Sequence, residues 1–306
     1  MGDSSSDSTR VLENPLQRVC SFMKNILTPL LCSPIRVTCR VSALLLMLGC
    51  HSPQLLAVDS EKELPDPEIP SYPENTDTLP EGMAMIEISP FGYIGASSEE
   101  GEQFNNPFMI QYGLTDNIEL RVIDNGFSFT SGYRQYRGFE PPTFGALIHL
   151  IDQGDDFFEP SIAFESLFAT DLLGNDATRG GFQPTLQFAV EHTLPMEISF
   201  NYTLAALRTR NEINQNTWEF QFSWAFQRPM FRDDLDLFIH GTYNTADLTA
   251  PYSPSSSPLY STGESVAGAG FLWKYVPNFS IYGQLSGGLS STTPSMISWG
   301  GFSWAF

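Results

Sequence analysis

The chain has 306 residues, a formal net charge of -20 at pH 7 and a sequence pI of about 4.3. Such an acidic balance argues against nucleic-acid binding, because phosphates need a basic protein face. All four cysteines, Cys20, Cys32, Cys39 and Cys50, lie near the start of the chain. Their spacings are irregular and no histidine pair accompanies them, so we expect no metal site and no other cofactor.

A short apolar run, residues 41–50, follows a basic stretch. This is the layout of a secretory signal, and the run is shorter than the roughly twenty residues that a transmembrane helix needs. We therefore expect residues 1–57 to be a targeting segment that is cleaved after Ala57. Acylation of Cys50 as a lipoprotein is the alternative. The polar stretch before Met23 is unusual for a signal, so Met23 is a candidate for the true start.

Residues 58–82 form an acidic stretch that is rich in proline. Prolines lack an amide donor and like charges repel, which is typical of an extended, disordered linker. We expect this linker to lie in the periplasm, and a partner-binding motif is the alternative.

From about residue 83 onward the side chains alternate with a period of two, which predicts β-strands. The clearest case is residues 217–226, where aromatic residues occupy every even position and polar or small residues every odd one. One face of this strand is therefore aromatic and the other is hydrophilic. Residues 185–191 and 197–204 repeat the pattern.

We expect about twelve such strands, most of them about 9–13 residues long, which suits a tilted membrane strand better than a globular one. Their predicted centres lie near residues 89, 109, 121, 147, 163, 187, 202, 221, 240, 270, 283 and 301.

The predicted connections differ in length. Residues 115–117, 194–195 and 276–278 are short turns, and the links between the fourth and fifth and the eighth and ninth strands are expected to be a little longer. Short turns at one end and long loops at the other indicate an outer-membrane barrel. An even strand count places both chain ends at the short-turn end. The expected long loops are residues 125–141, 170–180, 208–216 and 246–262.

The chain ends on a strand in which Phe302, Trp304 and Phe306 share one face. A terminal aromatic on an alternating strand resembles the membrane-insertion signal of outer-membrane proteins, which predicts the barrel-assembly machinery as a partner. An ordinary edge strand is the alternative, but exposed edges promote aggregation and barrel closure removes them.

If the aromatic faces meet outer-membrane lipid, the opposite faces line the lumen, because charges facing lipid are costly. Twelve strands then predict a narrow, partly plugged, acidic lumen that favours cations or neutral solutes. The candidate lining residues are Glu119, Arg121, Glu165, Gln187, Glu191, Glu197, Asn201, Glu219, Gln221, His240, Asn244, Lys274 and Gln284.

An enzyme is not expected, because the sequence has no Gly-x-Ser-x-Gly elbow or other local hydrolase signature. A barrel hydrolase stays open as an alternative, since catalytic groups need not be adjacent in sequence. Loss of phospholipid or ester hydrolysis on His149→Ala or His240→Ala would support it.

Residues 107–121, with a Tyr-Gly-Leu-Thr-Asp turn leading into Glu-Leu-Arg, resemble the outer-membrane family named after the meta-pathway of phenol degradation, whose members are also called transporters. The Ile-Ser-Pro-Phe stretch at residues 88–91 and the turn at residues 194–195 are similar to that family too. The resemblance covers about residues 83–306 and implies a channel for small aromatic or hydrophobic solutes.

The sequence therefore predicts an all-β protein, with a closed antiparallel transmembrane barrel of about twelve strands over residues 83–306. A signal peptide and a disordered linker are expected to precede the barrel. Its expected function is transport of a small solute across the outer membrane. A structural or surface-interaction barrel, acting through the extracellular loops 125–141 and 246–262, is the main alternative.

Overall fold

A computed structural model describes eleven stretches of the chain, and every regular element in them is a β-strand. Among these residues, no helix is long and apolar enough to span a membrane. The expected targeting segment, with Met23, Cys50 and Ala57, lies outside the described part. The described stretches are residues 64–69, 72–96, 101–124, 126–131, 136–139, 142–154, 159–169, 183–210, 216–245, 264–290 and 293–306.

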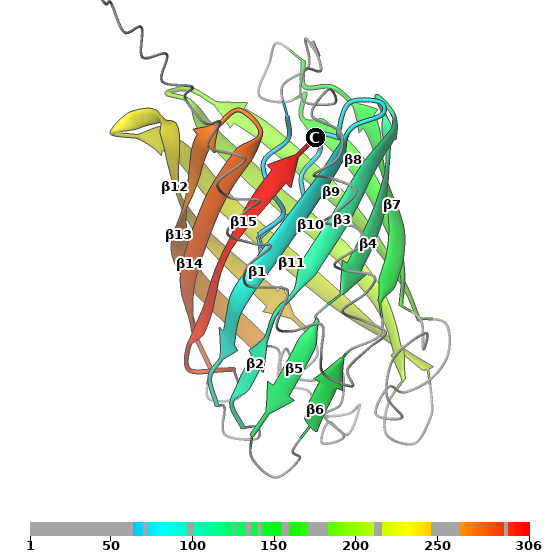
Figure 1. The fold of residues 1–306 in the computed structure, drawn as a ribbon, viewed down its shortest axis with the longest axis vertical. Coiled ribbons are helices and arrows are strands. Elements are labelled where there is room, and N and C mark those ends of the chain that lie inside the picture. Colours follow the sequence, from blue (N-terminus) through cyan, green and yellow to red (C-terminus); the bar gives the residue numbers. More distant parts are fainter. Residues whose placement is uncertain are drawn as a thin grey trace, which may run out of the picture. The chain divides into compact units, whose positions relative to one another are not determined.

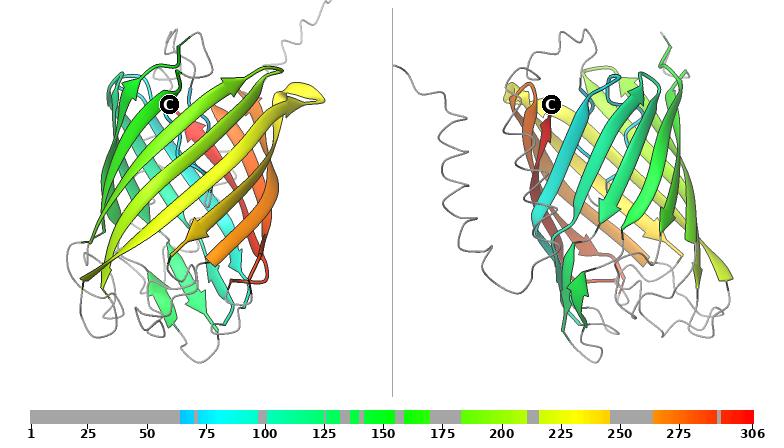
Figure 2. Two further views of the ribbon diagram at one scale, coloured as in Figure 1. Left: turned by 180° about the vertical axis from the view of Figure 1, so that it is seen from behind. Right: turned by 45° about the vertical axis from the view of Figure 1, so that its right-hand side comes forward.

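Long antiparallel strands form a closed barrel, as Figures 1 and 2 show. β15 pairs with β1, so the wall has no open edge, as a sheet in lipid requires. The predicted twelve-stranded barrel is confirmed, and each predicted strand centre falls within one wall strand. The wall strands are β1 (Ala84–Ile94), β3 (Phe108–Thr115), β4 (Ile118–Asp124), β7 (Thr143–Ile151), β8 (Ser161–Ala169), β9 (Gln183–Leu194), β10 (Ile198–Arg210), β11 (Asn216–Met230), β12 (Arg232–Asn244), β13 (Glu264–Val276), β14 (Phe279–Gly288) and β15 (Ile297–Ala305).

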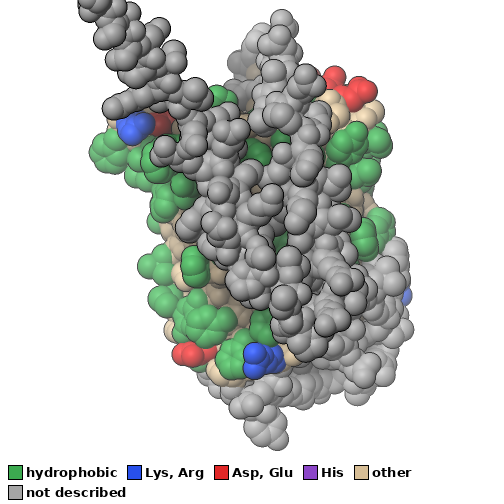
Figure 3. Space-filling model, viewed as in Figure 1, with side chains coloured by type: hydrophobic (Ala, Val, Ile, Leu, Met, Phe, Trp, Pro, Cys, Tyr) green, Lys and Arg blue, Asp and Glu red, His purple; other side chains and the backbone are tan. Residues whose placement is uncertain are grey.

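Side chains alternate between the two faces of the wall as predicted. On β11, Trp218 is 51% exposed and Phe220 is 58% exposed, whereas Ser223 and Ala225 are buried. The aromatic face therefore points outward and the hydrophilic face points into the barrel. In the view of Figure 3, hydrophobic side chains gather on the visible parts of the described wall, and most of the charged groups in view lie toward its two ends. This distribution matches a wall that meets hydrocarbon.

The two ends of the barrel differ in their connections. At one end, which we call the short-turn end, β3 and β4 are joined through Asp116 and Asn117 and β13 and β14 through Pro277 and Asn278. Ala84 and Phe306 also meet at this end, where each backbone amide donates to the carbonyl of the other residue. Both ends of the wall thus lie on the side that the even strand count predicts. We call the opposite end the long-loop end.

Some connections differ from the predictions. Phe231 alone joins β11 to β12, with a positive φ of 70°, where a longer link is predicted. β10 and β11 extend further than expected and leave only residues 211–215 between them. Glu197, a predicted lining residue, lies instead in the turn before β10 with a φ of 58°. The alternating pattern does not reveal these changes, because it continues up to and through tight turns.

Three short strands lie beyond the long-loop end of β1. They are β2 (Gln103–Asn105), β5 (Phe127–Thr130) and β6 (Tyr136–Phe139), and they pair in that order from β1 outward. The predicted loop 125–141 therefore contains two paired strands. Their outer face carries the exposed rings of Phe104, Phe129 and Phe139.

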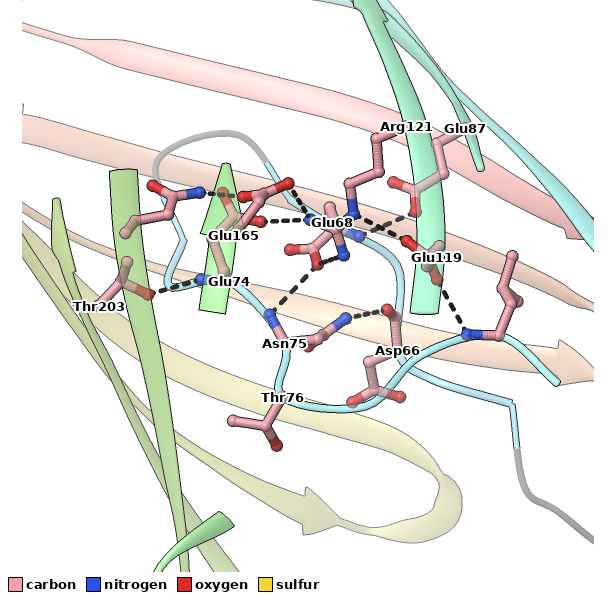
Figure 4. A network of polar contacts seen from close by, with 12 residues as sticks. Asp66, Glu68, Glu74, Asn75, Thr76, Glu87, Glu119, Arg121, Glu165 and Thr203 are labelled. Atoms are coloured by element: carbon pink, nitrogen blue, oxygen red, sulfur yellow. Dashed lines mark hydrogen bonds and ion pairs between the residues drawn. The ribbon is translucent and has the colours of Figure 1, made fainter. Parts of the chain in front are cut away.

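The acidic, proline-rich stretch differs most from its prediction. Its described part, residues 64–69 and 72–80, runs inside the barrel rather than as a disordered linker outside it (Figures 1 and 4), and we call it the inner segment. Leu64 and Leu79 both pack in the cluster formed with Met83 and Ala305 at the short-turn end. Both ends of the inner segment therefore lie at that end of the barrel.

Candidate functional site

The centre of the site is Arg121, an inward-facing residue of β4. Its side chain is only 1% exposed, although arginine is almost never fully buried without partners. Alternation along β4 places Glu119 on the same inner face, and the strands two places away on either side add Glu165 on β8 and Glu87 on β1. A single guanidinium is thereby surrounded by carboxyl groups.

Arg121 contacts four carboxylates that come from the wall and from the inner segment (Figure 4). From the wall, Glu119 lies 2.7 Å from Nε and Glu165 lies 2.8 Å from Nη1. From the inner segment, Glu68 lies 2.8 Å from Nη2 and Glu74 lies 2.9 Å from Nη1. The fork of the guanidinium suits such multiple contacts, which fix the inner segment to the wall.

Further hydrogen bonds within this cluster tie the inner segment's backbone to wall carboxylates. The amide of Glu68 donates to Glu87 Oε1 at 3.0 Å, and the amide of Leu79 donates to Glu119 Oε2 at 2.9 Å. The other Glu87 oxygen, Oε2, is buried and has no hydrogen-bond partner among the described residues. Gln187 also donates to Glu165. Together Glu68, Glu74, Glu87, Glu119, Glu165 and Arg121 form what we call the carboxylate cage.

Outside the cage, the inner segment is bound along its length. The Tyr72 hydroxyl donates to Gln227 at 2.7 Å, and the Glu74 amide donates to Thr203 at 2.9 Å. Lys274 pairs with Asp66 at 2.9 Å. Polar side chains inside a barrel are good partners for a polar segment, and its prolines have no amide donor to satisfy.

Apolar contacts add to this binding. Ile69 and Tyr72 are buried against wall residues that include Phe238 and Tyr282, and the rings of Tyr72 and Phe238 meet edge to face at 4.9 Å. Gly113 on β3 allows the close approach of the segment's end, because a Cβ there would lie 2.2 Å from the Pro80 carbonyl oxygen. The inner segment is therefore packed as well as hydrogen-bonded.

Glu68 and Glu74 lie on the inner segment and outside the membrane-spanning strands. Burial raises the pKa of Glu68 to about 7 and the pKa of Glu74 to about 8, while Arg121 acts to lower both. The like charge of Glu68 also raises the pKa of Glu74. The Glu74 side chain keeps 26% of its surface exposed, so water moderates the effect of burial there.

The structure groups some of the predicted lining residues and separates others. Glu119, Arg121 and Glu165 meet in the cage, while Glu191 accepts a hydrogen bond from Thr76 of the inner segment at 3.2 Å. Lys274 contacts the inner segment through Asp66. Three others lie on the inner faces of their strands outside the cage. These are Glu219 and Gln221 on β11 and His240 on β12, where His240 Nε2 lies 3.0 Å from Ser286 Oγ.

The sequence predictions missed the carboxyl groups that the inner segment contributes. Glu68 and Glu74 fall in the predicted linker, and Glu87 is absent from the predicted lining residues. One signal was present, because the apolar residues Leu64, Ile69, Tyr72 and Leu79 recur through the acidic stretch. A linker that is solvated over its whole length does not bury apolar side chains, so their recurrence indicates a packed segment.

Toward the long-loop end, the inner face carries amide, hydroxyl and indole groups. Trp299 on β15 lies against Gly92, where an added Cβ would be 2.1 Å from the indole ring. Trp299 Nε1 and Asn105 Oδ1 are both buried without a hydrogen-bond partner among the described residues. The described residues contain no group of three or more histidine, cysteine, aspartate or glutamate side chains that could hold a metal ion.

The terminal aromatic residues occupy the outer face of β15. Phe302, Trp304 and Phe306 are each partly exposed, whereas Ser303 and Ala305 between them are buried. Phe302 also packs against Phe279 on β14, with ring centroids 5.9 Å apart. The outward position of these three aromatic residues is the one that the alternation predicts. Their role in membrane insertion stays a prediction.

Comparisons with known proteins agree on the fold. The structure is similar to a COG4313 outer membrane channel from Pseudomonas putida F1, with a TM-score of 0.54 and 12% sequence identity over 78% of this chain and 100% of that chain. The NanC porin gives a TM-score of 0.48 and 7% identity over 72% of this chain and 98% of that chain. No protein-family model and no curated protein matches the sequence. The similarity to the COG4313 channel shows the fold of an outer-membrane barrel, and the specific phenol-pathway label is not confirmed.

Proposed function

We propose that this protein is an outer-membrane channel for small solutes and that its lumen is closed by the inner segment. The observation that carries the proposal is a closed barrel with a hydrophilic interior, in which Arg121 binds two carboxylates of the inner segment within the lumen. In outer-membrane barrels the short turns face the periplasm. The inner segment then enters from the periplasmic side, as expected for a chain exported with an N-terminal signal.

The charges of the lumen favour cations and neutral solutes. Besides the cage, the inner faces carry the acidic residues Glu191, Glu219 and Asp236. The described inward cations are Arg121 and Lys274, and both are paired with carboxylates. An acidic pore lining attracts cations and repels anions.

The groups near the long-loop end support a solute that combines an apolar body with a hydroxyl or amide. Trp299 offers an apolar ring and an indole N–H, Asn105 offers an amide oxygen, and neither polar atom has a partner among the described residues. Aromatic or hydrophobic solutes with one polar group match these partners and also the family that residues 107–121 resemble. Solutes of that kind are our preferred class.

Planar-bilayer recording tests the channel directly. Refolded full-length protein should give discrete conductance steps with a weak cation preference, and a variant that lacks residues 64–80 should give larger or longer openings. A heat-modifiable, folded band on gels is the control for both proteins. A folded deletion variant that conducts no current would refute the channel function.

A surface-interaction barrel is the second candidate. It is favoured by the aromatic side chains that β2, β5 and β6 expose beyond the wall, among them Phe129, which is 43% exposed. If the loops perform the function, deleting residues 246–262 should abolish partner binding while conductance stays unchanged.

The hydrolase alternative rests on the contact between His240 and Ser286. Their 3.0 Å separation is within the range of a nucleophile and its base. Lipid or ester hydrolysis that is lost on His240→Ala would revive this alternative.

A further inference from the structure

The carboxylate cage holds more acid than its one cation can neutralise. Five carboxyl groups, on Glu68, Glu74, Glu87, Glu119 and Glu165, surround Arg121 inside the barrel. Full ionisation would leave an uncompensated negative charge in a buried place, where carboxyls take up protons instead. Glu87 Oε2 is buried without a hydrogen-bond partner among the described residues, and the like charge of Glu68 raises the pKa of Glu74.

The excess acid is divided between the two parts that must separate when the channel opens. Glu68 and Glu74 belong to the inner segment, whereas Glu87, Glu119, Glu165 and Arg121 belong to β1, β4 and β8 of the wall. Arg121 compensates one negative charge, so each further ionisation within the cage adds repulsion between the inner segment and the wall. When the segment withdraws, water solvates the carboxylates of both parts.

We propose that the carboxylate cage is a proton-operated latch, in which protons shared among its carboxyl groups hold the inner segment in the barrel and their loss releases it. The latch rests on the channel function proposed above and adds its regulation. The channel is closed in acid and opens as the pH rises.

Proton linkage gives the direction in which docking of the inner segment changes with pH. In water Glu68 and Glu74 titrate near a pKa of 4.5, and inside the barrel burial raises their pKa values to about 7 and about 8. A carboxyl with a raised pKa stabilises the docked state fully below pH 4.5, and this contribution is lost as the pH rises through the docked pKa. The latch therefore weakens mainly between about pH 5 and pH 8.

Two substitutions in the full-length protein distinguish docking that depends on protonation from docking that does not. Glu68→Gln and Glu74→Gln keep the size and hydrogen-bonding capacity of the side chains and remove their titration. Glu81→Gln is the matched control, because Glu81 is an exposed acidic residue of the same stretch and its side chain lies outside the cage. All variants are first checked for a folded, heat-modifiable band.

Conductance and hydrogen exchange are then recorded between pH 5 and pH 9. For the wild type and Glu81→Gln, we expect the open fraction to rise by about tenfold or more, since one unit of pKa shift corresponds to a factor of ten. The doubly substituted Glu68→Gln, Glu74→Gln protein should stay closed and nearly independent of pH. Corrected for intrinsic rates, amide exchange in residues 64–80 should follow the same pattern, with the amides of the wall strands as reference.

The exchange measurement does not depend on ion flow. If the wild type conducts nothing at any pH while exchange in residues 64–80 rises with pH, the latch stands and the channel function fails. If exchange in the wild type is flat with pH, or if the doubly substituted protein follows the wild type, the latch is overturned whatever the conductance.

Discussion

Replacing Arg121 by methionine should release the inner segment while leaving the barrel folded. The substitution keeps a long side chain and removes the guanidinium that contacts Glu68 and Glu74 at 2.8 and 2.9 Å. Breaking a buried ion pair by removing one partner costs about 3–5 kcal/mol. Glu119 and Glu165 also lose their partner, but water can solvate both once the segment has left. The substitution therefore destabilises the docked state relative to the state in which the inner segment has left the barrel.

A loss of about 3–5 kcal/mol corresponds to a shift of the docking equilibrium by about a hundredfold to a few thousandfold. Protonation of the orphaned carboxyls limits this loss at low pH. Planar-bilayer recording should show Arg121→Met open for most of the time under conditions in which the wild type is closed. Arg232→Met serves as the control, because Arg232 is 63% exposed and pairs with Asp234 at the short-turn end.

The reasoning is wrong if Arg121→Met folds and keeps the wild-type conductance and the wild-type exchange in residues 64–80. Such a result would mean that the apolar contacts of Ile69, Tyr72 and Leu79 suffice to hold the segment. A variant that fails to give a heat-modifiable band would instead assign Arg121 to barrel assembly.

Three further predictions address the wall, the close approach of the segment and the chain end. Phe222→Arg, on the outward face of β11, should reduce refolding into lipid because an arginine facing hydrocarbon costs about 2–4 kcal/mol near the midplane, whereas the inward Gln221→Arg should refold normally in the same gel assay. Gly113→Val should displace Pro80 and speed exchange in residues 72–80, while Gly300→Val, whose Cβ would meet nothing closer than 4.0 Å, should not. Phe306→Ala should slow insertion by the barrel-assembly machinery and Phe91→Ala, at an exposed ring of β1, should not; equal rates would remove the proposed role of the terminal aromatic.

The wall of this protein could be predicted from the sequence because the alternation of side chains is visible within each strand by itself. In β11 the aromatic and polar positions alternate without a break from Thr217 to Phe226, and this pattern alone decides which side meets lipid. The placement of Glu119, Arg121 and Glu165 on inner faces follows from the same rule. What the rule leaves undetermined is the exact turn, as Phe231 and Glu197 show.

The inner segment could not be predicted in this way, because its location depends on partners far away in the sequence. Read alone, residues 64–80 have the charge and proline content of a solvated linker. Inside the barrel the same groups meet Arg121, Thr203 and Gln227, which lie on three different strands. Contacts of this kind become visible only once the strands are closed into a ring.

The position of both ends of the inner segment has a consequence for how the channel can work. Leu64 and Leu79 both lie at the short-turn end of the barrel, so the inner segment can leave and re-enter the lumen through that end. Residues 80–83 would keep it attached to β1 during this movement. None of the backbone hydrogen bonds that pair β1 with β15 has to break during this movement. Opening and unfolding are thus separate events, and a protein whose inner segment is permanently withdrawn should keep the strand pairings that close the wall.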